Sequence, residues 1–360
     1  MLLVETIGSS SMDMYSRKLA EKLDIPVFYT DIYEKCVECR NISWLSPEAV
    51  RTFWHDWRFV RRLNRLGDIV HLPNHHLGRY GNFLRVPYII TVHDLIRYLD
   101  LKGYGPFIHY PNFRDRFYFN LDYKGIKKAK RIIAVSLATK NDLIHYLGIP
   151  DERISIVYHG IDHKLFRPVS HRIHNDPYVL FVGSEHPRKN FAGLLKAFSK
   201  LKSEPRFKDL KLVKVGRAGG QEADYRGQTL EVVKALGLVN KVIFTDVVPE
   251  ADLPAYYSGA EVFVLPSLYE GFGVPPLEAM ACGCPVVTSN ASSLPEVVGE
   301  AGIMVNPLDT DNLAQAMRQV LTDAKLRDEM ITKGLAQSKR FSWEETARQT
   351  LEVYNKVAGE

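Results

Sequence analysis

Long hydrophobic runs are missing from this sequence. Nowhere in its 360 residues does the chain approach the ~20 consecutive apolar residues that a membrane-spanning helix needs. The first residues, Met1–Ile7, contain Glu5 and lack a basic leader, a long apolar core and a small-residue cleavage site, so they do not form a secretory signal. The sequence therefore predicts a cytoplasmic protein, and peripheral association with the inner face of a membrane stays open.

Cysteine is also scarce. The chain has four, of which Cys36 and Cys39 form one C-x-x-C pair and Cys282 and Cys284 flank a glycine. A structural zinc site usually takes two such pairs, or histidines at fixed spacing, and here the two pairs would have to meet in space. Free thiols in a reducing compartment are the favoured interpretation, and no metal or other cofactor is expected.

Charge is unevenly divided along the chain. Residues 1–169 carry 25 Lys and Arg against 18 Asp and Glu, whereas residues 170–360 carry 22 against 24. A basic N-terminal half indicates an anionic partner, such as a phosphorylated acceptor or a membrane surface. The sequence contains no compact basic motif or known nucleic-acid module, so nucleic acid is not expected to bind.

Short β-rich runs alternate with amphipathic helical patterns, and the series occurs twice. This alternation predicts an α/β protein with two Rossmann-like, doubly wound domains that face a cleft. The polar segment 162–176 marks the boundary, so residues 1–169 form the first domain and residues 170–342 the second. A last helix, about 343–360, is expected to pack back onto the first domain. The expected strands are 1–7, 25–30, 68–72, 87–93, 131–135, 154–159, 178–183, 210–216, 242–245, 262–265, 285–288 and 303–305.

The strongest motif is the segment Pro266–Gly283, which reads PSLYEGFGVPPLEAMACG and lies between two apolar strands. Gly271 and Gly273 permit a tight turn whose backbone approaches a ligand, and the prolines that follow suit the first turn of a helix. The N-terminus of such a helix favours phosphate through its free N–H groups. Glu270 at the strand end and Glu278 in the early helix are acceptors for sugar or ribose hydroxyls.

These two glutamates form the E-x7-E pair of the family 4 retaining glycosyltransferases, and the flanking segments 279–283 and 289–297 are similar to the same family. The resemblance covers nearly the whole chain and is closest to mannosyltransferases. It implies the GT-B fold, a nucleotide-sugar donor and a ribose contact by Glu278. The groups that it implies hold the transferred sugar are Glu270 and the backbone of Gly271, Phe272, Gly273 and Val274.

A second motif, GSEHPRKN at residues 183–190, directly follows an apolar strand. Two adjacent cations there can neutralise a diphosphate, Arg188 as a planar fork and Lys189 as a point charge. The family usually has an arginine directly after the glycine and a lysine a few residues on. Lys189 matches the lysine, whereas Ser184 occupies the arginine position, so we expect Arg188 to supply the second charge. An exposed basic turn is the alternative.

Two segments of the first domain match positions where the family contacts its ligands. His93 lies in TVHDL at the end of an apolar strand, where the resemblance implies a contact with the donor sugar. A structural role is the alternative for a lone histidine. The first loop keeps Gly8 of the family's glycine pair, and Ser9 and Ser10 offer hydroxyl hydrogen bonds in place of the second glycine.

Three further histidines, His71, His75 and His76, cluster in HLPNHH. Histidine is a common metal ligand, but no carboxylate or cysteine stands at a convincing spacing, and the family's fold needs no metal. A place in the acceptor pocket is therefore favoured over a metal site.

One expected helix, 47–66, combines basic residues with tryptophan. Trp54 and Trp57 are typical of residues that enter a membrane interface. Two interpretations stay open: a helix that binds an anionic membrane, and an ordinary helix with a solvated basic face. The basic residues are Arg51, Arg58, Arg61, Arg62 and Arg65.

Together these features predict a retaining, metal-independent glycosyltransferase that uses a nucleotide-sugar, with GDP-mannose favoured. The expected acceptor is a glycan or a lipid-linked glycan in cell-surface polysaccharide synthesis. Two other classes remain as alternatives: a non-catalytic, two-lobed sugar-binding protein, and a glycan phosphorylase. The expected catalytic residues are Glu270, Lys189, Arg188 and His93.

Overall fold

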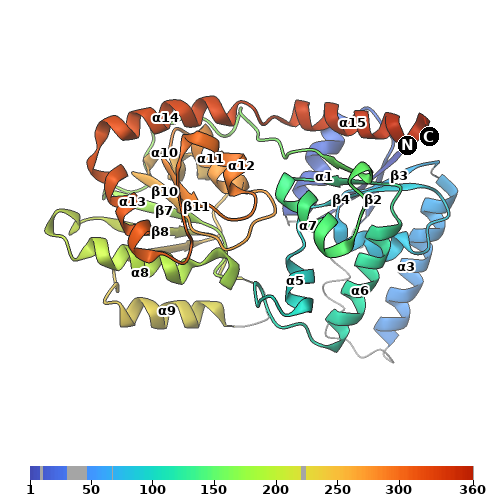
Figure 1. Ribbon diagram of the computed structural model, residues 1–360, viewed down its shortest axis with the longest axis horizontal. Helices are drawn as coiled ribbons and strands as arrows, with labels where there is room; N and C mark the ends of the chain where they lie inside the picture. Colours follow the sequence, from blue (N-terminus) through green and yellow to red (C-terminus); the bar gives the residue numbers. More distant parts are fainter. Residues whose placement is uncertain (9–10, 31–46, 67, 220–223, 360) are drawn as a thin grey trace. The chain divides into compact units, whose positions relative to one another are not determined.

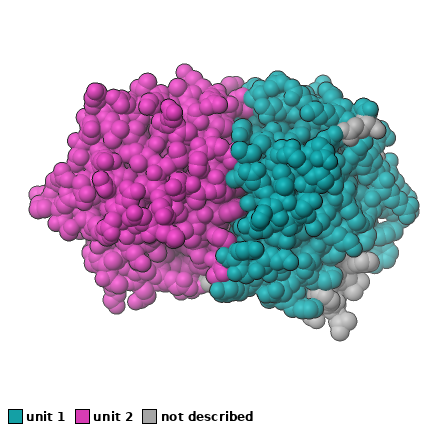
Figure 2. Space-filling model, in the orientation of Figure 1, with its two compact units in different colours: residues 1–104, 110–160, 343–360 teal, residues 105–109, 161–342 magenta. Residues whose placement is uncertain are grey.

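The computed structural model describes residues 1–8, 11–30, 47–66, 68–219 and 224–359, which form two compact units (Figure 2). Unit 1 comprises residues 1–104, 110–160 and 343–360. Unit 2 comprises residues 105–109 and 161–342. The division therefore falls after Gly160, earlier than the sequence indicates, and the short segment Gly105–His109 belongs to unit 2.

Unit 1 is built on a parallel sheet of six strands in the order β2-β1-β3-β4-β5-β6. Figure 1 labels β2, β3 and β4 of this sheet. The order reverses between β1 and β3, so the loops that follow these two strands mark the topological switch point of the unit. The strands are β1 (Leu2–Thr6), β2 (Val27–Thr30), β3 (Val70–Leu72), β4 (Tyr88–Val92), β5 (Arg131–Ala134) and β6 (Ile154–Ile156).

The two faces of this sheet bury different side chains, because successive residues of a strand point in opposite directions. Leu2 and Val4 face a core that includes residues of α3, α6 and α7, whereas Leu3 faces a second core with α1 and α15. Helices therefore cover both faces. The helices of unit 1 are α1 (Ser11–Lys22), α3 (Pro47–Leu66), α4 (Gly78–Gly81), α5 (Ile96–Lys102), α6 (Phe113–Lys128), α7 (Leu137–Leu147) and α15 (Trp343–Gly359).

Helix α15 is the last segment of the chain, yet its core partners come from the N-terminal half. Its Tyr354 hydroxyl lies 2.6 Å from Nδ1 of His71, and its Thr346 hydroxyl donates to the carbonyl of Tyr158 at 2.8 Å. The face of the unit 1 sheet that carries Leu3 is thus completed only when the C-terminal segment has docked.

Unit 2 holds a second parallel sheet of six strands in the order β12-β11-β10-β7-β8-β9. All twelve expected strands are present, so the prediction of two Rossmann-like domains is confirmed. The strands of unit 2 are β7 (Tyr178–Val182), β8 (Lys211–Val215), β9 (Val242–Asp246), β10 (Val262–Leu265), β11 (Val286–Ser289) and β12 (Ile303–Val305). Its helices are α8 (Phe191–Lys202), α9 (Tyr225–Ala235), α10 (Leu253–Gly259), α11 (Val274–Ala281), α12 (Leu294–Val298), α13 (Thr310–Thr322) and α14 (Ala324–Ser338).

The strand order of unit 2 reverses between β7 and β10. Strands β8 and β9 continue on one side of this pair and β11 and β12 on the other. Ligands of open α/β sheets bind beyond the carboxyl ends of the strands at such a point. The loops after β7 and β10 are therefore where a ligand site is expected. None of the described helices is both long and apolar enough to cross a membrane.

Candidate active site

The loops after β7 and β10 are tied to each other by Asn190. This residue has a left-handed backbone with φ of 52°, a conformation that asparagine tolerates better than most residues. Its side-chain amide donates to the carbonyls of Pro266 at 3.1 Å and Pro307 at 2.7 Å. The N–H of Leu268 donates in turn to the carbonyl of Arg188 at 2.6 Å. These bonds hold the basic turn of the first loop against the second loop.

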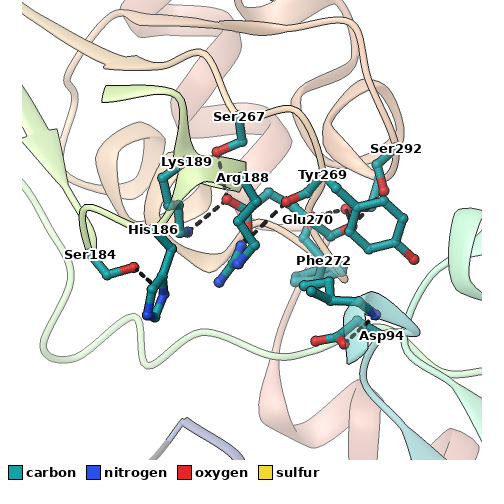
Figure 3. Close-up of polar contacts among 12 residues, drawn as sticks. Asp94, Ser184, His186, Arg188, Lys189, Ser267, Tyr269, Glu270, Phe272 and Ser292 are labelled. Carbon is teal, nitrogen blue, oxygen red and sulfur yellow. Dashed lines mark hydrogen bonds and ion pairs between the residues drawn. The ribbon is translucent and has the colours of Figure 1, made fainter. Parts of the chain in front are cut away.

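Glu270, in the loop after β10, accepts hydrogen bonds from three side chains at once (Figure 3). Its Oε1 accepts from Lys189 Nζ at 2.7 Å and from the Ser267 hydroxyl at 2.6 Å, and its Oε2 accepts from Arg188 Nη1 at 2.8 Å. Glu270 and Lys189 are buried, and Arg188 is partly exposed. The structure thus brings together the three residues that the two sequence motifs singled out separately.

The ionisation of Glu270 follows from these neighbours. Burial by itself raises the pKa of the carboxyl group, but the charges of Lys189 and Arg188 outweigh it and hold the pKa at about 2. The group is therefore a carboxylate at any pH near neutrality, and it is neutralised by two cations.

Hydroxyl groups from the loop after β11 fix the main chain around Glu270. Ser292 and Ser293 donate to the Glu270 carbonyl at 2.6 Å and 3.0 Å, and Ser293 also lies 2.7 Å from the carbonyl of Phe272. Ser289, at the end of β11, donates to the carbonyl of Ser267 at 2.5 Å. The backbone that carries Glu270 is consequently held by partners from the neighbouring strand.

The turn between Gly271 and Val274 leads directly into α11. Gly273 has φ of 109°, and a Cβ atom there would lie 2.8 Å from Cδ2 of Leu294, so the turn requires glycine. Helix α11 begins at Val274 with Pro275 in its first turn, where no N–H donor is needed. The four residues that the resemblance assigns to the donor sugar therefore form one tight turn at a helix N-terminus.

Glu278 lies one turn further into α11 and is partly buried. Its Oε2 accepts a hydrogen bond from the Tyr257 hydroxyl at 2.7 Å. Burial raises the pKa of Glu278 to about 7, although the bond from Tyr257 works in the opposite direction. Unlike Glu270, this carboxyl group changes its charge near neutral pH.

Ser184 stands where the family usually has an arginine. Its hydroxyl lies 2.9 Å from Nδ1 of His186, and the His186 ring meets that of Tyr225 edge-on with centroids 5.1 Å apart. Ser184 therefore orients His186 and brings no positive charge, which leaves Arg188 as the cation beside Lys189.

His93 follows β4 in unit 1 and is buried. Its Nε2 lies 2.8 Å from the carbonyl of Pro73 and must carry the proton, and its Nδ1 lies 3.3 Å from Nε2 of His159. Burial and the neighbouring His75 lower the pKa of His93 to about 4, so the ring is neutral. Both ring nitrogens have partners within unit 1, and a contact with the donor sugar stays a prediction.

Gly8 follows β1 in unit 1, and its carbonyl accepts a hydrogen bond from Arg17 at 3.2 Å. A Cβ atom on Gly8 would overlap the carboxyl group of Asp13, so the glycine allows the loop to approach α1 closely. Ser9 and Ser10 lie outside the described residues, and the predicted contacts of this loop with a ligand stay predictions.

The three histidines of the HLPNHH cluster, His71, His75 and His76, are buried in unit 1. His71 has 0% exposure and sits between the hydroxyls of Tyr354 at 2.6 Å and Thr91 at 2.8 Å, so its expected place in an acceptor pocket is wrong. Over the described residues, no group of three or more His, Cys, Asp or Glu is arranged to hold a metal ion. Cys36 and Cys39 lie outside those residues, and Cys282 and Cys284 are buried free thiols.

Three partners in the site are not apparent from the sequence. Ser267 and Tyr257 bind the two glutamates, and only the position of Ser267 just after an apolar strand hinted at a role. The third partner is the carbonyl of Phe107, which accepts the backbone N–H of Arg188 at 3.0 Å. No local pattern links Tyr257 to Glu278 or Phe107 to Arg188, because each of these two pairs is far apart in the sequence.

A doubly wound sheet with a carboxylate and two cations at its switch point defines a class: enzymes that bind a phosphorylated, hydroxyl-bearing substrate. Comparison with known families narrows this class. Residues 17–165 match the model described as Glycosyltransferase Family 4, and residues 162–337 match the one described as Glycosyl transferases group 1. The chain belongs to the family 4 glycosyltransferases. This assignment decides against the sugar-binding protein and the phosphorylase.

Two relatives from Escherichia coli are mannosyltransferases. O-antigen chain mannosyltransferase B is 36% identical over 255 residues, which cover 68% of this chain and 66% of the relative. Serotype-specific mannosyltransferase WbdA is 32% identical over 322 residues, which cover 83% of this chain but only 38% of the relative. The chain thus matches about two thirds of the first relative and much less than half of the second.

A solved structure shows the same fold. Anabaena Alr3699/HepE in complex with UDP-glucose has a TM-score of 0.79 at 18% identity, with 99% of both chains covered. The predicted GT-B fold is confirmed.

Proposed function

We propose that this glycosyltransferase moves mannose from GDP-mannose to a glycan or lipid-linked acceptor in polysaccharide synthesis, with retention of anomeric configuration. The observation that carries the proposal is the Glu270 carboxylate between Lys189 and Arg188 at the switch point of unit 2. The two mannosyltransferase relatives support mannose as the transferred sugar. The UDP-glucose bound to the Anabaena protein supports a nucleotide-sugar and makes uridine the alternative base.

In this reaction the acceptor hydroxyl forms a bond to the anomeric carbon. The bond from that carbon to the diphosphate breaks, its electron pair stays on the phosphate oxygen, and the acceptor proton passes to the leaving phosphate. Lys189, Arg188 and the N-terminus of α11 would stabilise the charge that develops on the leaving group. Attack on the face from which the diphosphate leaves, as the resemblance implies, gives retention without a carboxylate nucleophile.

Nucleotide binding tests this proposal directly. In a thermal-shift titration in EDTA, GDP is expected to raise the melting temperature and UDP to leave it unchanged, since a ligand at 100 times its Kd adds about 2.7 kcal/mol to stability. Stabilisation by UDP alone would end the mannose assignment. Absence of any effect from GDP, UDP and ADP would contradict a nucleotide-sugar donor altogether. Transfer that EDTA abolishes and manganese restores would overturn the metal-independent mechanism.

Glu278 predicts how donor binding depends on pH. If its carboxylate accepts ribose hydroxyls, protonation removes an acceptor, so donor KM is expected to rise by up to tenfold per pH unit below about 7. Glu278→Gln is expected to raise donor KM about tenfold at pH 8 with a smaller change in kcat, and to flatten this pH profile. Calorimetry of GDP at pH 6 and 8 measures both effects. Equal affinities for wild type at the two pH values would remove Glu278 from the site.

Helix α3 of unit 1 supports a membrane contact. Trp54 and Trp57 are 54% and 44% exposed, with their rings 5.5 Å apart, and the Arg61 guanidinium lies 4.9 Å from the Trp57 ring. Phe59 and Leu63 are buried in the core, so one face anchors the helix and the other presents tryptophan and arginine. We propose that this face binds anionic membranes peripherally, because interfacial tryptophans and basic residues act together there.

Sedimentation with anionic vesicles at low salt tests the contact. Each basic residue near such a surface contributes about 1 kcal/mol to binding. A variant of α3 that replaces four arginines with glutamine is therefore expected to stay mostly in the supernatant. A control with four exposed lysines of unit 1 changed to glutamine carries the same net charge and should still sediment. Equal behaviour of the two variants would show a nonspecific charge effect. The test variant changes Arg58, Arg61, Arg62 and Arg65 to Gln, and the control changes Lys102, Lys124, Lys127 and Lys128.

A further inference from the structure

The site contains an unexpected pairing. The resemblance assigns Glu270 to the sugar and the two cations to the diphosphate, yet in the structure all three residues bind one another. Lys189 Nζ and Arg188 Nη1 both lie within 2.8 Å of the Glu270 carboxylate. The carboxylate expected to bind the sugar and the cations expected to bind the diphosphate therefore form ion pairs with each other.

Arg188 is only partly satisfied by this pairing. Its Nη1 also lies 3.3 Å from the carbonyl of Tyr269, but its buried Nε has no hydrogen-bond partner among the described residues. A buried N–H without a partner costs free energy until an acceptor arrives. Since the backbone of Arg188 is fixed by Phe107 and Leu268, its side chain rather than its turn is free to change partners.

Arg188 and Lys189 cannot pair with Glu270 and bind a diphosphate at the same time, because both partners are anionic. One carboxylate neutralises half of the positive charge of the two cations, and a diphosphate seeks the same N–H donors. An ionised Glu270 that stayed between the cations would repel the phosphates at short range. Protonation of Glu270 does not remove this repulsion near neutral pH, because the pKa of Glu270 is about 2.

We propose that the nucleoside diphosphate displaces Glu270 from Arg188 and Lys189, and that the released carboxylate then accepts hydrogen bonds from hydroxyls of the donor hexose. Glu270 is thus the resting counterion of the phosphate site. The proposal rests on the nucleotide-sugar function given above. It makes the sugar-binding acceptor available only after the diphosphate has docked. After transfer, Glu270 recaptures both cations and helps to expel the nucleotide product.

Calorimetry of GDP and UDP with Glu270→Gln tests the displacement. Removal of the competing charge is expected to tighten binding of the preferred nucleotide about tenfold, although transfer is strongly reduced because the hexose loses its acceptor. Ser267→Ala is the matched control: it removes a hydrogen bond to the same carboxylate oxygen but keeps the charge, and should change nucleotide affinity less than twofold. Unchanged or weaker nucleotide binding by a folded Glu270→Gln variant would overturn the displacement. The proposed function would still stand in that case if the wild-type protein binds the nucleotide and transfers the sugar. No nucleotide binding by wild type overturns both.

A second measurement covers a Glu270→Gln variant that does not fold. Infrared difference spectra of the wild type with and without inorganic pyrophosphate report on carboxylates that change their partners. A shifted carboxylate band is expected when pyrophosphate binds, because Glu270 then loses its cationic partners. A ribose contact of Glu278 cannot cause this shift, since pyrophosphate carries no sugar. Bound pyrophosphate with no change in the carboxylate region would overturn the displacement.

Discussion

Replacing Lys189 with methionine is expected to lower kcat for sugar transfer about a thousandfold. The ammonium group is buried beside the position proposed for the leaving diphosphate, and loss of one such preorganised donor typically costs 10²–10³ in kcat. Methionine keeps most of the side-chain volume, so the loss arises from the charge. Donor KM should change much less than kcat, because the charge on the leaving group grows as the bond breaks.

Lys200→Met provides the matched control. Lys200 is an exposed lysine of α8 in the same unit, 2.6 Å from Asp311, and exposed pairs of this kind contribute little. Its rate should stay within twofold of wild type in an assay of released nucleotide. A Lys189→Met enzyme that keeps more than a tenth of wild-type kcat would contradict a role of this charge in the chemical step.

Replacing Gly125 with alanine is expected to lower the free energy of unfolding of unit 1 by about 3 kcal/mol or more, since overpacking of a rigid contact costs this much. Gly125 lies in α6 where α4 crosses it, and a Cβ atom there would overlap the backbone carbonyl of Gly78. A backbone atom cannot rotate away as a side chain can. The Gly125 carbonyl also accepts the Tyr88 hydroxyl at 2.5 Å, so a displaced helix loses that bond to β4 as well.

Gly359→Ala is the control for this substitution. Gly359 ends α15, and a Cβ atom there would meet nothing within 4 Å. Alanine also favours the helix, so this variant should be as stable as wild type or slightly more stable. Urea unfolding followed by circular dichroism compares the two. Coincident curves for Gly125→Ala and Gly359→Ala would show that the α4–α6 crossing is not tightly packed.

Much of the fold follows from patterns that neighbours in the sequence create. Short, mostly apolar runs of three to seven residues predict every strand of both sheets, because a strand that is buried on both faces needs a nearly continuous apolar sequence. The spacing of Glu270 and Glu278 places one in the loop after β10 and the other in the following helix, α11. The sequence near each motif, 183–190 and 266–283, is therefore enough to place it after a strand at the switch point of unit 2.

The properties of the site residues depend instead on partners far away in the chain. Glu270 meets Lys189 and Arg188 across 81 and 82 positions, and Tyr257 reaches Glu278 from the preceding helix, α10. Nothing in the motif separates the two carboxyl groups, yet one has a pKa of about 2 and the other of about 7, because one is buried with cations and the other with a hydroxyl. His71 shows the same limit, since only the docking of α15 makes it a core residue.

The sequence by itself determined the two doubly wound domains and the motifs that form the loops at the switch point of unit 2. The tertiary structure alone decided which of the motif residues pair, which of them are charged, and that Gly105–His109 joins unit 2. The physical reason is the distance along the chain over which each interaction acts. Strand and helix periodicity arises from adjacent residues, whereas ion pairing and pKa depend on burial and on charges that only the folded sheet brings within a few ångströms.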